Sequence, residues 1–366
     1  MDPDVQFMRR ALELAERARG LTSPNPLVGA VVVRDGIVVG EAFHERAGEA
    51  HAEAKALEGA GEAARGATLY VTLEPCVHHG RTPPCAPAVV AAGIRRAVVA
   101  TADPNPLVAG RGLTVLREAG LDVRTGVLEA EAQAQNRVFL TAMRSGRPHI
   151  TLKAAITLDG KIADGQGASQ WITGEAARRE GHRLRSEADA IAVGIGTVLQ
   201  DDPQLTVRLD CSWPREPYRV VLDSSARTPP TARLIRAGTP ARALIAVGAS
   251  APAARVDVLR AAGATVVPCA ARDGRVDVGA LLGDLFARDV RALLVEGGAA
   301  VHGAFLDAGV VDRAAFFMAP LLLGGVRAVA AVGGSGRELK NALRLQSVTV
   351  RMVGDDVLIE GDVRHS

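Results

Sequence analysis

The spacing of apolar residues alternates between helical and strand periods along the chain. From Asp4 to Arg19 the apolar positions recur every three or four residues, which predicts an amphipathic helix that stops near Gly20. The apolar runs Val28 to Val33 and Ile37 to Gly40 flank Asp35-Gly36, which is a typical two-residue hairpin turn. The chain therefore begins with a helix followed by a β-hairpin.

The alternation continues to about residue 120. A helix over Ala50 to Leu57, a buried strand over Thr68 to Leu73, a strand at Val98 to Ala100 and a helix over Leu113 to Ala119 are expected. Pro75-Cys76 is expected to begin another helix, ahead of a segment from Ala86 to Ala92. Alternating strands and helices of this kind predict an α/β layered domain.

A polar, turn-rich stretch from Arg144 to Pro148 separates two apolar segments and predicts a boundary between domains 1–146 and 147–366. The second domain is expected to open with a strand, Ile150 to Ile156. Further on, a buried strand at Leu293 to Val295 leads through Gly297-Gly298 into a helix over 299–308. Such a turn lets a backbone approach a phosphate closely, although ordinary α/β connections also use it.

The dinucleotide fingerprint G-x-G-x-x-G does not follow any expected strand here, and Gly194-Ile195-Gly196 is only a fragment of it. The 43 basic and 41 acidic residues of the 366 are well mixed, and only 3% of residues are aromatic, which argues against a nucleic-acid surface. No apolar run approaches the ~18 residues of a membrane span, and the first ten residues lack an apolar signal core. We therefore expect a soluble, cytoplasmic protein with reduced thiols.

Candidate chemistry is concentrated between His51 and Cys85. His51, Cys76 and Cys85 offer one imidazole and two thiolates, a set of three ligands that leaves one position of a tetrahedral zinc open, as in catalytic zinc sites. Zinc lowers the pKa of a bound water to about 7. Glu53, two residues from a ligand, is a candidate for the proton shuttle. H-x-E with P-C is the pattern of zinc-dependent base deaminases, in which the glutamate is not a ligand.

Two features leave room for other interpretations. The two cysteines are separated by eight residues, 77–84, instead of two, so a loop and not a helix must bring them together. His78 or His79 in this insert could supply a fourth ligand, which would make the zinc purely structural.

The motifs themselves resemble one family. His51-Ala52-Glu53 together with the run from Glu74-Pro75-Cys76 through His78-His79-Gly80-Arg81-Thr82-Pro83-Pro84-Cys85 is similar to the bifunctional riboflavin-biosynthesis deaminase/reductases. The first motif alone would indicate only the cytidine-deaminase-like superfamily. The resemblance extends in order through Lys153-Ala154-Ala155, 158–163, 169–173, 201–208 and Val295-Glu296-Gly297-Gly298.

For the first half, the resemblance implies a cytidine-deaminase-like three-layer α/β domain with zinc bound by His51, Cys76 and Cys85 and with Glu53 catalytic. It implies substrate contacts from Asn25, His44, Arg81 and Asn105. From residue type alone, Asn25 between two prolines could instead be a plain turn residue, and His44 could be a surface histidine.

For the second half, the resemblance implies a dihydrofolate-reductase-like domain that binds NADPH, which would explain the missing fingerprint. The implied NADPH contacts are Ala155, Trp171, Thr197, Asp201, Ser224, Gly298, Ala299, Ala300, Val301, His302, Gly303 and Ala304. The implied substrate contacts are Ser169, Arg185, Leu205, Arg208 and Glu296.

Residue chemistry is consistent with these assignments. Arg185 and Arg208 carry fork-shaped donors suited to a ribose phosphate. Lys153 is a candidate for contact with the ribityl hydroxyls. Trp171 could pack against the nicotinamide, or it could be a core tryptophan, and Asp202-Pro203 could be an ordinary turn.

These observations predict a bifunctional enzyme: zinc-dependent hydrolytic deamination of 2,5-diamino-6-(5-phosphoribosylamino)pyrimidin-4-one, then NADPH-dependent reduction of its ribosyl chain to ribityl. We expect a homo-oligomer that acts on small pyrimidine ribotides and has no nucleic-acid or membrane partner. Two rival interpretations are a nucleic-acid or nucleoside deaminase with a structural appendage, and a non-catalytic zinc protein. Glu53 argues against the latter, because a structural site has no use for that carboxylate.

Overall fold

The computed structural model describes residues 2–80, 82–272 and 274–364. The chain folds as two compact units, residues 1–146 and 147–366. Among the described residues, no helix has both the length and the apolar character that a membrane span requires. Arg81, one of the predicted substrate contacts, lies outside the described residues.

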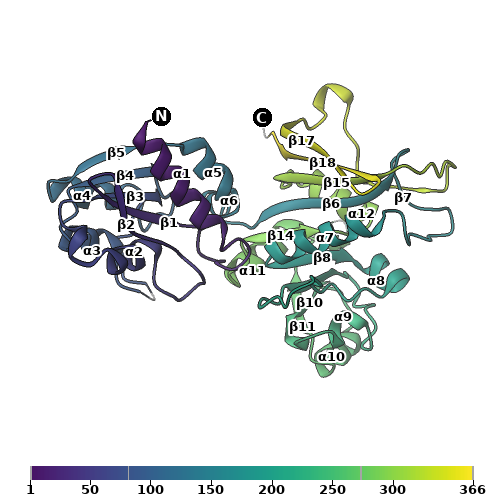
Figure 1. Cartoon of the computed structure of the whole chain (residues 1–366). Helices are drawn as coiled ribbons and strands as arrows, with labels where there is room; N and C mark the ends of the chain where they lie inside the picture. The colour runs from purple at the N-terminus through teal and green to yellow at the C-terminus, as the bar shows by residue number, and fades with distance from the viewer. Residues whose placement is uncertain (1, 81, 273, 365–366) are drawn as a thin grey trace. The chain divides into compact units, whose positions relative to one another are not determined.

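The first unit is built on a five-stranded sheet in the order β2-β1-β3-β4-β5 (Figure 1). β1 runs antiparallel to both β2 and β3, whereas β3, β4 and β5 are parallel. The strands are β1 (Gly29–Arg34), β2 (Ile37–Phe43), β3 (Thr68–Leu73), β4 (Arg96–Thr101) and β5 (Asp122–Thr125). The helices are α1 (Pro3–Glu16), α2 (Ala52–Ala60), the 3-10 turn η1 (Gly61–Ala64), α3 (Cys85–Ala91), α4 (Arg111–Glu118), α5 (Glu129–Gln135) and α6 (Arg137–Ser145).

Helices cover both faces of this sheet. Apolar residues of α2, α3, α4 and α6 pack on one face, and those of α1 and α5 pack on the other. The alternation of side chains along β1 explains this division, because Val32 belongs to the first core and Val31 to the second. The three-layer α/β architecture expected for residues 1–146 is confirmed.

Most expected elements of this unit are present. The strand over Thr68 to Leu73 has the predicted ends. The β-hairpin has its turn at Asp35-Gly36, and both residues have the positive φ that a two-residue turn of type I′ requires.

The prediction of a helix beginning at Pro75-Cys76 is wrong. Those residues are not helical, and the carbonyl of Cys76 instead accepts a hydrogen bond from the Ala86 N–H, 3.0 Å away. The backbone of Cys76 is therefore hydrogen-bonded to the segment that carries Cys85.

The second unit contains a nine-stranded sheet in the order β11-β10-β9-β8-β14-β6-β15-β18-β17. All strands from β11 to β15 are parallel, and β18 and β17 continue the sheet antiparallel. Its strands are β6 (His149–Thr157), β8 (Ala190–Gly194), β9 (Tyr218–Leu222), β10 (Ala243–Gly248), β11 (Thr265–Cys269), β14 (Ala292–Val295), β15 (Arg313–Ala319), β17 (Leu345–Val353) and β18 (Asp356–Val363). Two short pairs lie outside it: β12 (Ala271–Arg272) with β13 (Arg275–Val276), and β7 (Lys161–Ala163) with β16 (Val329–Ala330).

The helices of the second unit also lie on both faces of the sheet. They are α7 (Glu175–Glu187), α8 (Ile195–Asp201), α9 (Arg233–Arg236), α10 (Ala253–Ala261), α11 (Val278–Ala287) and α12 (Ala299–Asp307), with 3-10 turns at Pro240–Arg242 and Leu339–Asn341. α11 and α12 pack on one core, and α8, α9 and α10 pack on the opposite one. α7 covers the inner part of β15 and β18. The expected strand over Ile150 to Ile156 and the strand-Gly-Gly-helix unit at Val295 to Ala299 are both confirmed.

One buried carboxylate ties α1 to the sheet of the first unit. Asp4, only 4% exposed, accepts two hydrogen bonds from Arg96 at 2.7 and 2.8 Å and one from the Tyr70 hydroxyl at 2.9 Å, and it also pairs with Arg124. Hydrogen bonds from Arg96, against the opposing effect of burial, lower the pKa of Asp4 from 3.8 to about 2. Asp4 is therefore charged in the folded unit.

We predict that Asp4→Asn destabilises the first unit by about 3 kcal/mol, because it leaves Arg96 without its buried counter-ion. The folded-state pKa lies below the ordinary value, so the contribution of Asp4 is complete above about pH 4 and is lost as the pH falls towards about 2. Calorimetry of the full chain should show a gap between the variant and the wild type that closes over this pH range.

Asp122→Asn is the matched control, because Asp122 pairs with the same arginine from a side chain that is 72% exposed. It should cost about 0.5 kcal/mol or less. Equal effects of the two substitutions, or a gap that does not depend on pH, would show that Asp4 does not act through its charge.

Candidate active sites

Three metal-binding side chains meet in the first unit. His51 is the N-cap of α2, Cys76 lies in the loop after β3, and Cys85 is the first residue of α3. The Nδ1 atom of His51 is 3.3 Å from the Sγ of Cys85 and 3.5 Å from the Sγ of Cys76, and all three donor atoms lie within 4.8 Å of one another. The structure therefore brings together donors that are up to 34 residues apart.

The donor set fits a zinc ion. Ligand bonds of about 2.0–2.3 Å in a tetrahedron place the donor atoms roughly 3.6 Å apart, close to the spacings found here. Within the described ranges, neither His78 nor His79 joins this group. The structural-zinc alternative with four protein ligands is thus not supported, and three donors are consistent with an open fourth position.

One of the two thiols already favours the form that a metal needs, whereas the hydrogen bonds with Cys76 raise the pKa values of Cys85 and His51. The hydrogen bond from Cys85 is the largest influence on Cys76 and, with His51, lowers its pKa to about 4, so this sulfur is a thiolate. The backbone N–H of Cys85 also donates to that sulfur, at 3.4 Å. Zinc binds cysteine as thiolate, so these hydrogen bonds place Cys76 in its ligand form before the ion binds.

Glu53 sits beside this group in the first turn of α2. Its side chain is 4% exposed, and burial raises the pKa of Glu53 to about 7, while contacts with the Cys85 thiol and His51 oppose the rise. A carboxyl group with a pKa near neutrality can both accept and return a proton. The sequence prediction for Glu53 therefore matches its position.

The long insert between the cysteines contributes an unanticipated contact. The hydroxyl of Thr82 lies 3.3 Å from the Nε2 of His51, on the side of the ring opposite the donor atom Nδ1. A hydroxyl that accepts from Nε2–H fixes the tautomer in which Nδ1 carries the free lone pair. Thr82 belongs to the motif, but the sequence does not indicate which residue of the insert contacts the His51 imidazole.

The predicted substrate residues Asn25 and His44 lie together. The amide of Asn25 is 3.0 Å from Nε2 of His44, whose Nδ1 is 3.2 Å from the Ala50 carbonyl, and the His44 ring meets that of His51 edge-on with centroids 5.4 Å apart. His44 is 2% exposed, so the surface-histidine alternative is wrong. Burial lowers the pKa of His44, which keeps it neutral.

Asn105 lies in the loop after β4. β3 and β4 are parallel, so this loop leaves the sheet at the same edge as Cys76. The N–H of Asn105 donates to Asp103 and its side-chain carbonyl accepts from Leu107. Within residues 2–80 and 82–272, no hydrogen bond joins Asn105 directly to His51 or the cysteines.

The second unit has a large cleft of about 970 Å³. Most of the residues assigned to NADPH or substrate by resemblance line it: Ala155, Ser169, Trp171, Arg185, Thr197, Asp201, Leu205, Arg208, Glu296, Gly298, Ala299, Ala300, Val301 and His302. Five lysines or arginines but only two acidic residues stand among the described lining residues. That balance favours phosphorylated ligands.

One wall of the cleft fits a nicotinamide dinucleotide. Gly298, with φ +71°, turns the chain from β14 into α12, so the first N–H groups of that helix are available to a phosphate. A Cβ on Gly297 would lie 2.8 Å from the Val193 side chain, so the turn packs tightly on β8. Packing against β8 therefore requires the glycine at 297, and the approach of this backbone to a phosphate stays a prediction.

A charged cluster forms the floor. Arg185 donates to both oxygens of Glu296 at 2.7 Å and to the Thr206 carbonyl at 3.0 Å. Burial alone would raise the pKa of Glu296, but Arg185 and Lys153 lower it to about 2. Burial also lowers the pKa of Lys153. Glu296 is therefore an anion that pairs with Arg185 at the bottom of the cleft, which Lys153 also lines.

His182 joins this cluster and was not anticipated. Its Nδ1 accepts from the Arg208 N–H at 3.2 Å. Burial, together with Arg185 and Arg208, lowers the pKa of His182 to about 4, so it is neutral at physiological pH. One histidine in a basic, arginine-rich helix gives no signal in the sequence.

Two further predicted residues are bonded to each other, since the Ser169 hydroxyl donates to Asp201 at 3.0 Å. Trp171 is 68% exposed at the cleft, with the Arg178 guanidinium 4.7 Å from its ring centroid. The alternative that Trp171 is a core residue is therefore wrong. Arg178 is another lining residue that the sequence did not indicate.

Some predicted residues do not face the cleft. Ser224, Gly303 and Ala304 are not among the described lining residues, and the Ser224 hydroxyl accepts from the Val276 N–H at 3.0 Å. The Leu205 side chain is 2% exposed within the core, so a ligand can meet only its backbone. The roles assigned to these four residues stay predictions, as do those of the residues that line the cleft.

Comparisons with known proteins agree with this geometry. Residues 1–101 match the family model of the cytidine and deoxycytidylate deaminase zinc-binding region, and residues 148–359 match the RibD C-terminal domain. The riboflavin biosynthesis protein RibD of Escherichia coli is 43% identical over 97% of this chain and 98% of its own length. The chain belongs to the RibD family.

Solved structures of RibD proteins have the same fold. One form of Acinetobacter baumannii RibD superposes with a TM-score of 0.89 at 38% identity, covering 99% of both chains. A Thermotoga maritima protein named diaminohydroxyphosphoribosylaminopyrimidine deaminase/5-amino-6-(5-phosphoribosylamino)uracil reductase gives 0.84 at 36% identity, again covering 99% of both chains. RibD membership confirms the predicted fold class and the predicted cofactors, Zn²⁺ and NADPH.

We predict that Thr82→Val weakens zinc binding about tenfold or more, because it removes the hydroxyl that orients the His51 ring. Thr82→Ser keeps the hydroxyl and should bind zinc like the wild type. Competition with a chromophoric chelator measures both affinities on the purified chain. Equal affinity of the valine variant and the wild type would remove Thr82 from the metal site.

Proposed function

We propose that this chain catalyses two successive steps of riboflavin biosynthesis, one in each unit. The first is the hydrolytic deamination of 2,5-diamino-6-(5-phosphoribosylamino)pyrimidin-4-one, and the second is the NADPH-dependent reduction of the ribosyl side chain to ribityl. The observation that carries the proposal is the meeting of His51, Cys76 and Cys85 beside the buried Glu53. The name of the full-length Thermotoga maritima relative supports the substrate assignment.

In the deamination, His51, Cys76 and Cys85 hold the zinc ion and Glu53 is the catalytic acid and base. Zinc at this site supplies the Lewis acidity that makes water a nucleophile near neutral pH. Glu53 accepts a proton from the attacking water and donates it to the ring nitrogen. It then takes the second proton, from the hydroxyl newly bonded to the ring carbon, and donates it to the amino group, which leaves as ammonia while a carbonyl forms. Asn25, His44, Arg81 and Asn105 position the pyrimidine.

In the reduction, the cleft of the second unit would hold NADPH and the ribotide. When bound, NADPH would supply the hydride for C1′ of the sugar in its ring-opened imine form, and the imine nitrogen would take a proton from solvent. Arg185 and Arg208 bind the phosphate of the ribotide, and Lys153 faces its sugar hydroxyls. Glu296 keeps Arg185 oriented through the paired hydrogen bonds described above.

The rival interpretations fit the structure less well. A deaminase with a purely structural appendage would not need a second cleft whose floor buries Lys153, Arg185 and Glu296. A non-catalytic zinc protein would not need Glu53 buried beside an incomplete set of ligands. The mixed surface charge favours a small substrate over nucleic acid.

Two separate assays on the purified, zinc-loaded chain test the proposal. Ammonia release from the diaminopyrimidine ribotide and loss of NADPH absorbance are followed independently. Both activities are expected. Deamination without NADPH oxidation would reduce the second unit to a remnant, and the absence of both would overturn the proposal.

Glu53→Gln should abolish ammonia release, with a loss of at least about 10²-fold, because the amide cannot carry the proton. NADPH oxidation with the pre-deaminated ribotide should survive, since its cleft lies within the other unit. Glu58→Gln, an exposed change on the same helix, is the control and should leave both rates unchanged. Loss of both activities in Glu53→Gln would contradict independent sites.

We further propose that the protein is a cytoplasmic homo-oligomer, with no nucleic-acid or membrane partner, that associates through β17. Ten of the 17 large hydrophobic residues that are exposed in the described part of the chain lie between Leu321 and Met352. On the edge strand β17, Val348, Val350 and Met352 are 49%, 64% and 63% exposed. An apolar edge strand of this length is a site of pairing with another strand.

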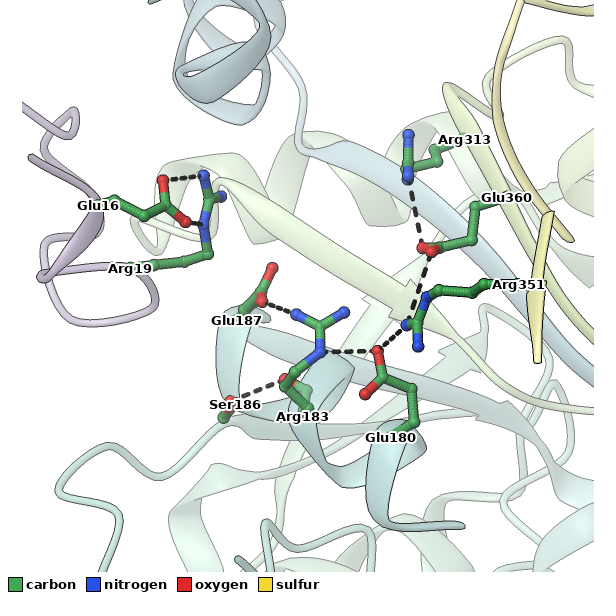
Figure 2. Close-up of polar contacts among 9 residues, drawn as sticks. All are labelled: Glu16, Arg19, Glu180, Arg183, Ser186, Glu187, Arg313, Arg351 and Glu360. Atoms are coloured by element: carbon green, nitrogen blue, oxygen red, sulfur yellow. Dashed lines mark hydrogen bonds and ion pairs between the residues drawn. The ribbon is translucent and has the colours of Figure 1, made fainter. Parts of the chain in front are cut away.

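The charges of this region are engaged on the face that α7 covers. Figure 2 shows the Arg351 guanidinium between Glu180 of α7 and Glu360 of β18, with Arg183 and Arg313 extending the network. Val350 and Met352 alternate with Arg351 and so point to the opposite face. A second copy offers the same uncharged, apolar surface, which makes an isologous contact self-complementary.

Val350→Glu combined with Met352→Glu should halve the mass measured by light scattering after size exclusion, because paired carboxylates would face each other across the two-fold axis. Val258→Glu is the matched control, since Val258 is 50% exposed on α10. A monomeric wild type, or an unchanged mass in the double variant, would exclude this interface.

A further inference from the structure

The carboxylate of Glu74 makes an unusual set of contacts for a residue next to a metal site. One oxygen accepts from the N–H groups of Gly112 and Leu113, at 2.8 and 3.2 Å, and the other from those of Asp103 and Gly110, both at 3.1 Å. Its side chain is buried, with 3% exposed. All four partners are backbone groups 29 to 39 residues further along the chain.

Three of these donors belong to the beginning of α4. Gly110 is the N-cap of this helix, in a left-handed conformation with φ +84°, and it has no side chain with which to cap. The first N–H groups of a helix need acceptors and attract negative charge. Glu74 supplies that acceptor from a different segment, so it caps α4 across the chain.

The fourth donor, Asp103, begins the loop that carries Asn105. Asp103 in turn accepts from the N–H of Asn105 at 2.8 Å, which connects Asn105 to Glu74 through two successive hydrogen bonds. The loop is thus held at both ends, at Asp103 and at Gly110, by one carboxylate. Pro75 and Cys76 directly follow that carboxylate in the chain.

Packing at this junction is tight. A Cβ on Gly112 would lie 2.0 Å from the Pro75 carbonyl oxygen, so the start of α4 rests directly on the segment between Glu74 and Cys76. The N–H of Glu74 itself donates to the Thr101 carbonyl at 3.0 Å, where β3 and β4 end together. The position of the cysteine ligand and that of the Asn105 loop are therefore fixed by the same contacts.

We propose that Glu74 is a positioning residue of the deaminase, which sets the Asn105 loop at the right distance from the metal. The carboxylate touches neither substrate nor metal in this role. It acts through the loop, so its loss should weaken substrate binding more than it slows the chemical step. The inference rests on the proposed function of the first unit and adds a residue to it.

Glu74→Gln tests the proposal, because an amide keeps the shape but turns one acceptor into a donor that faces N–H groups. The KM for the diaminopyrimidine ribotide should rise about tenfold or more, kcat should fall less, and zinc content should stay at one ion per chain. Hydrogen exchange of the amides from 103 to 113 should become faster. Glu118→Gln, an exposed change at the end of α4, should leave all four quantities unchanged.

Asn105→Ala separates the substrate contact from the capping of α4. It should reproduce the rise in KM without faster exchange of the Gly110, Gly112 and Leu113 amides that Glu74 holds. Glu74→Asp, which retains the charge but is one carbon shorter, should lie between Gln and the wild type. NADPH oxidation by the same molecules reports that the second unit has folded, and a content of one zinc ion per chain reports that the first unit has folded.

Unchanged exchange in Glu74→Gln would overturn the capping role, whatever the substrate is. Faster exchange with an unchanged KM would overturn the positioning role while the proposed function stands. A wild-type chain that shows no deamination would contradict the proposed function itself, and the exchange data would still report on the cap. Loss of zinc in Glu74→Gln would instead make Glu74 part of the metal site's structure and would also refute the proposal.

Discussion

The first unit depends on bringing one nitrogen and two sulfur atoms to a common point. None of the three ligand residues lies in the middle of a helix or strand: His51 precedes α2, Cys76 follows β3, and Cys85 begins α3. The packing of α2 and α3 on the same face of the sheet fixes their separation. Every other feature of the site, including the buried Glu53 and the contacts of Thr82 and Glu74, serves or uses this arrangement.

The second unit must bind two phosphorylated molecules without burying much uncompensated positive charge. Glu296 at the end of β14 neutralises part of the positive floor, and the turn at Gly298 exposes helix N–H groups. The remaining positive charge is available to ligands. The turn at Gly298 and the basic lining residues offer donors suited to phosphates, so the missing Rossmann fingerprint does not count against a nicotinamide cofactor.

Much of the fold and of the chemistry could be read from the sequence, because the information was local. Thr68 to Leu73 is a short apolar run with clear ends, and Asp35-Gly36 is a turn whose geometry follows from its residues. His51, Glu53, Cys76 and Cys85 are rare residue types whose spacing limits what they can do. The strand-Gly-Gly-helix unit at Val295 to Ala299 was clear for the same reason.

What the sequence did not reveal depends on distant partners. Pro75-Cys76 looked like a helix start, but the carbonyl of Cys76 bonds to Ala86 across the insert. Glu74 is a motif residue, but the sequence does not predict its contacts, because its partners are backbone N–H groups that have no residue signature. The burial of His44 and the exposure of Trp171 were equally undecided, because each depends on which segments pack against it.

The central claim is a zinc ion held by one imidazole and two thiolates, with one position left for water. X-ray absorption at the zinc edge of the purified chain tests it most directly. The expected shell has two sulfur atoms at about 2.3 Å and two lighter atoms, one from His51 and one from water, at about 2.0–2.1 Å. A shell with two imidazoles and two sulfurs, with more than two sulfurs, or the absence of bound zinc would contradict it.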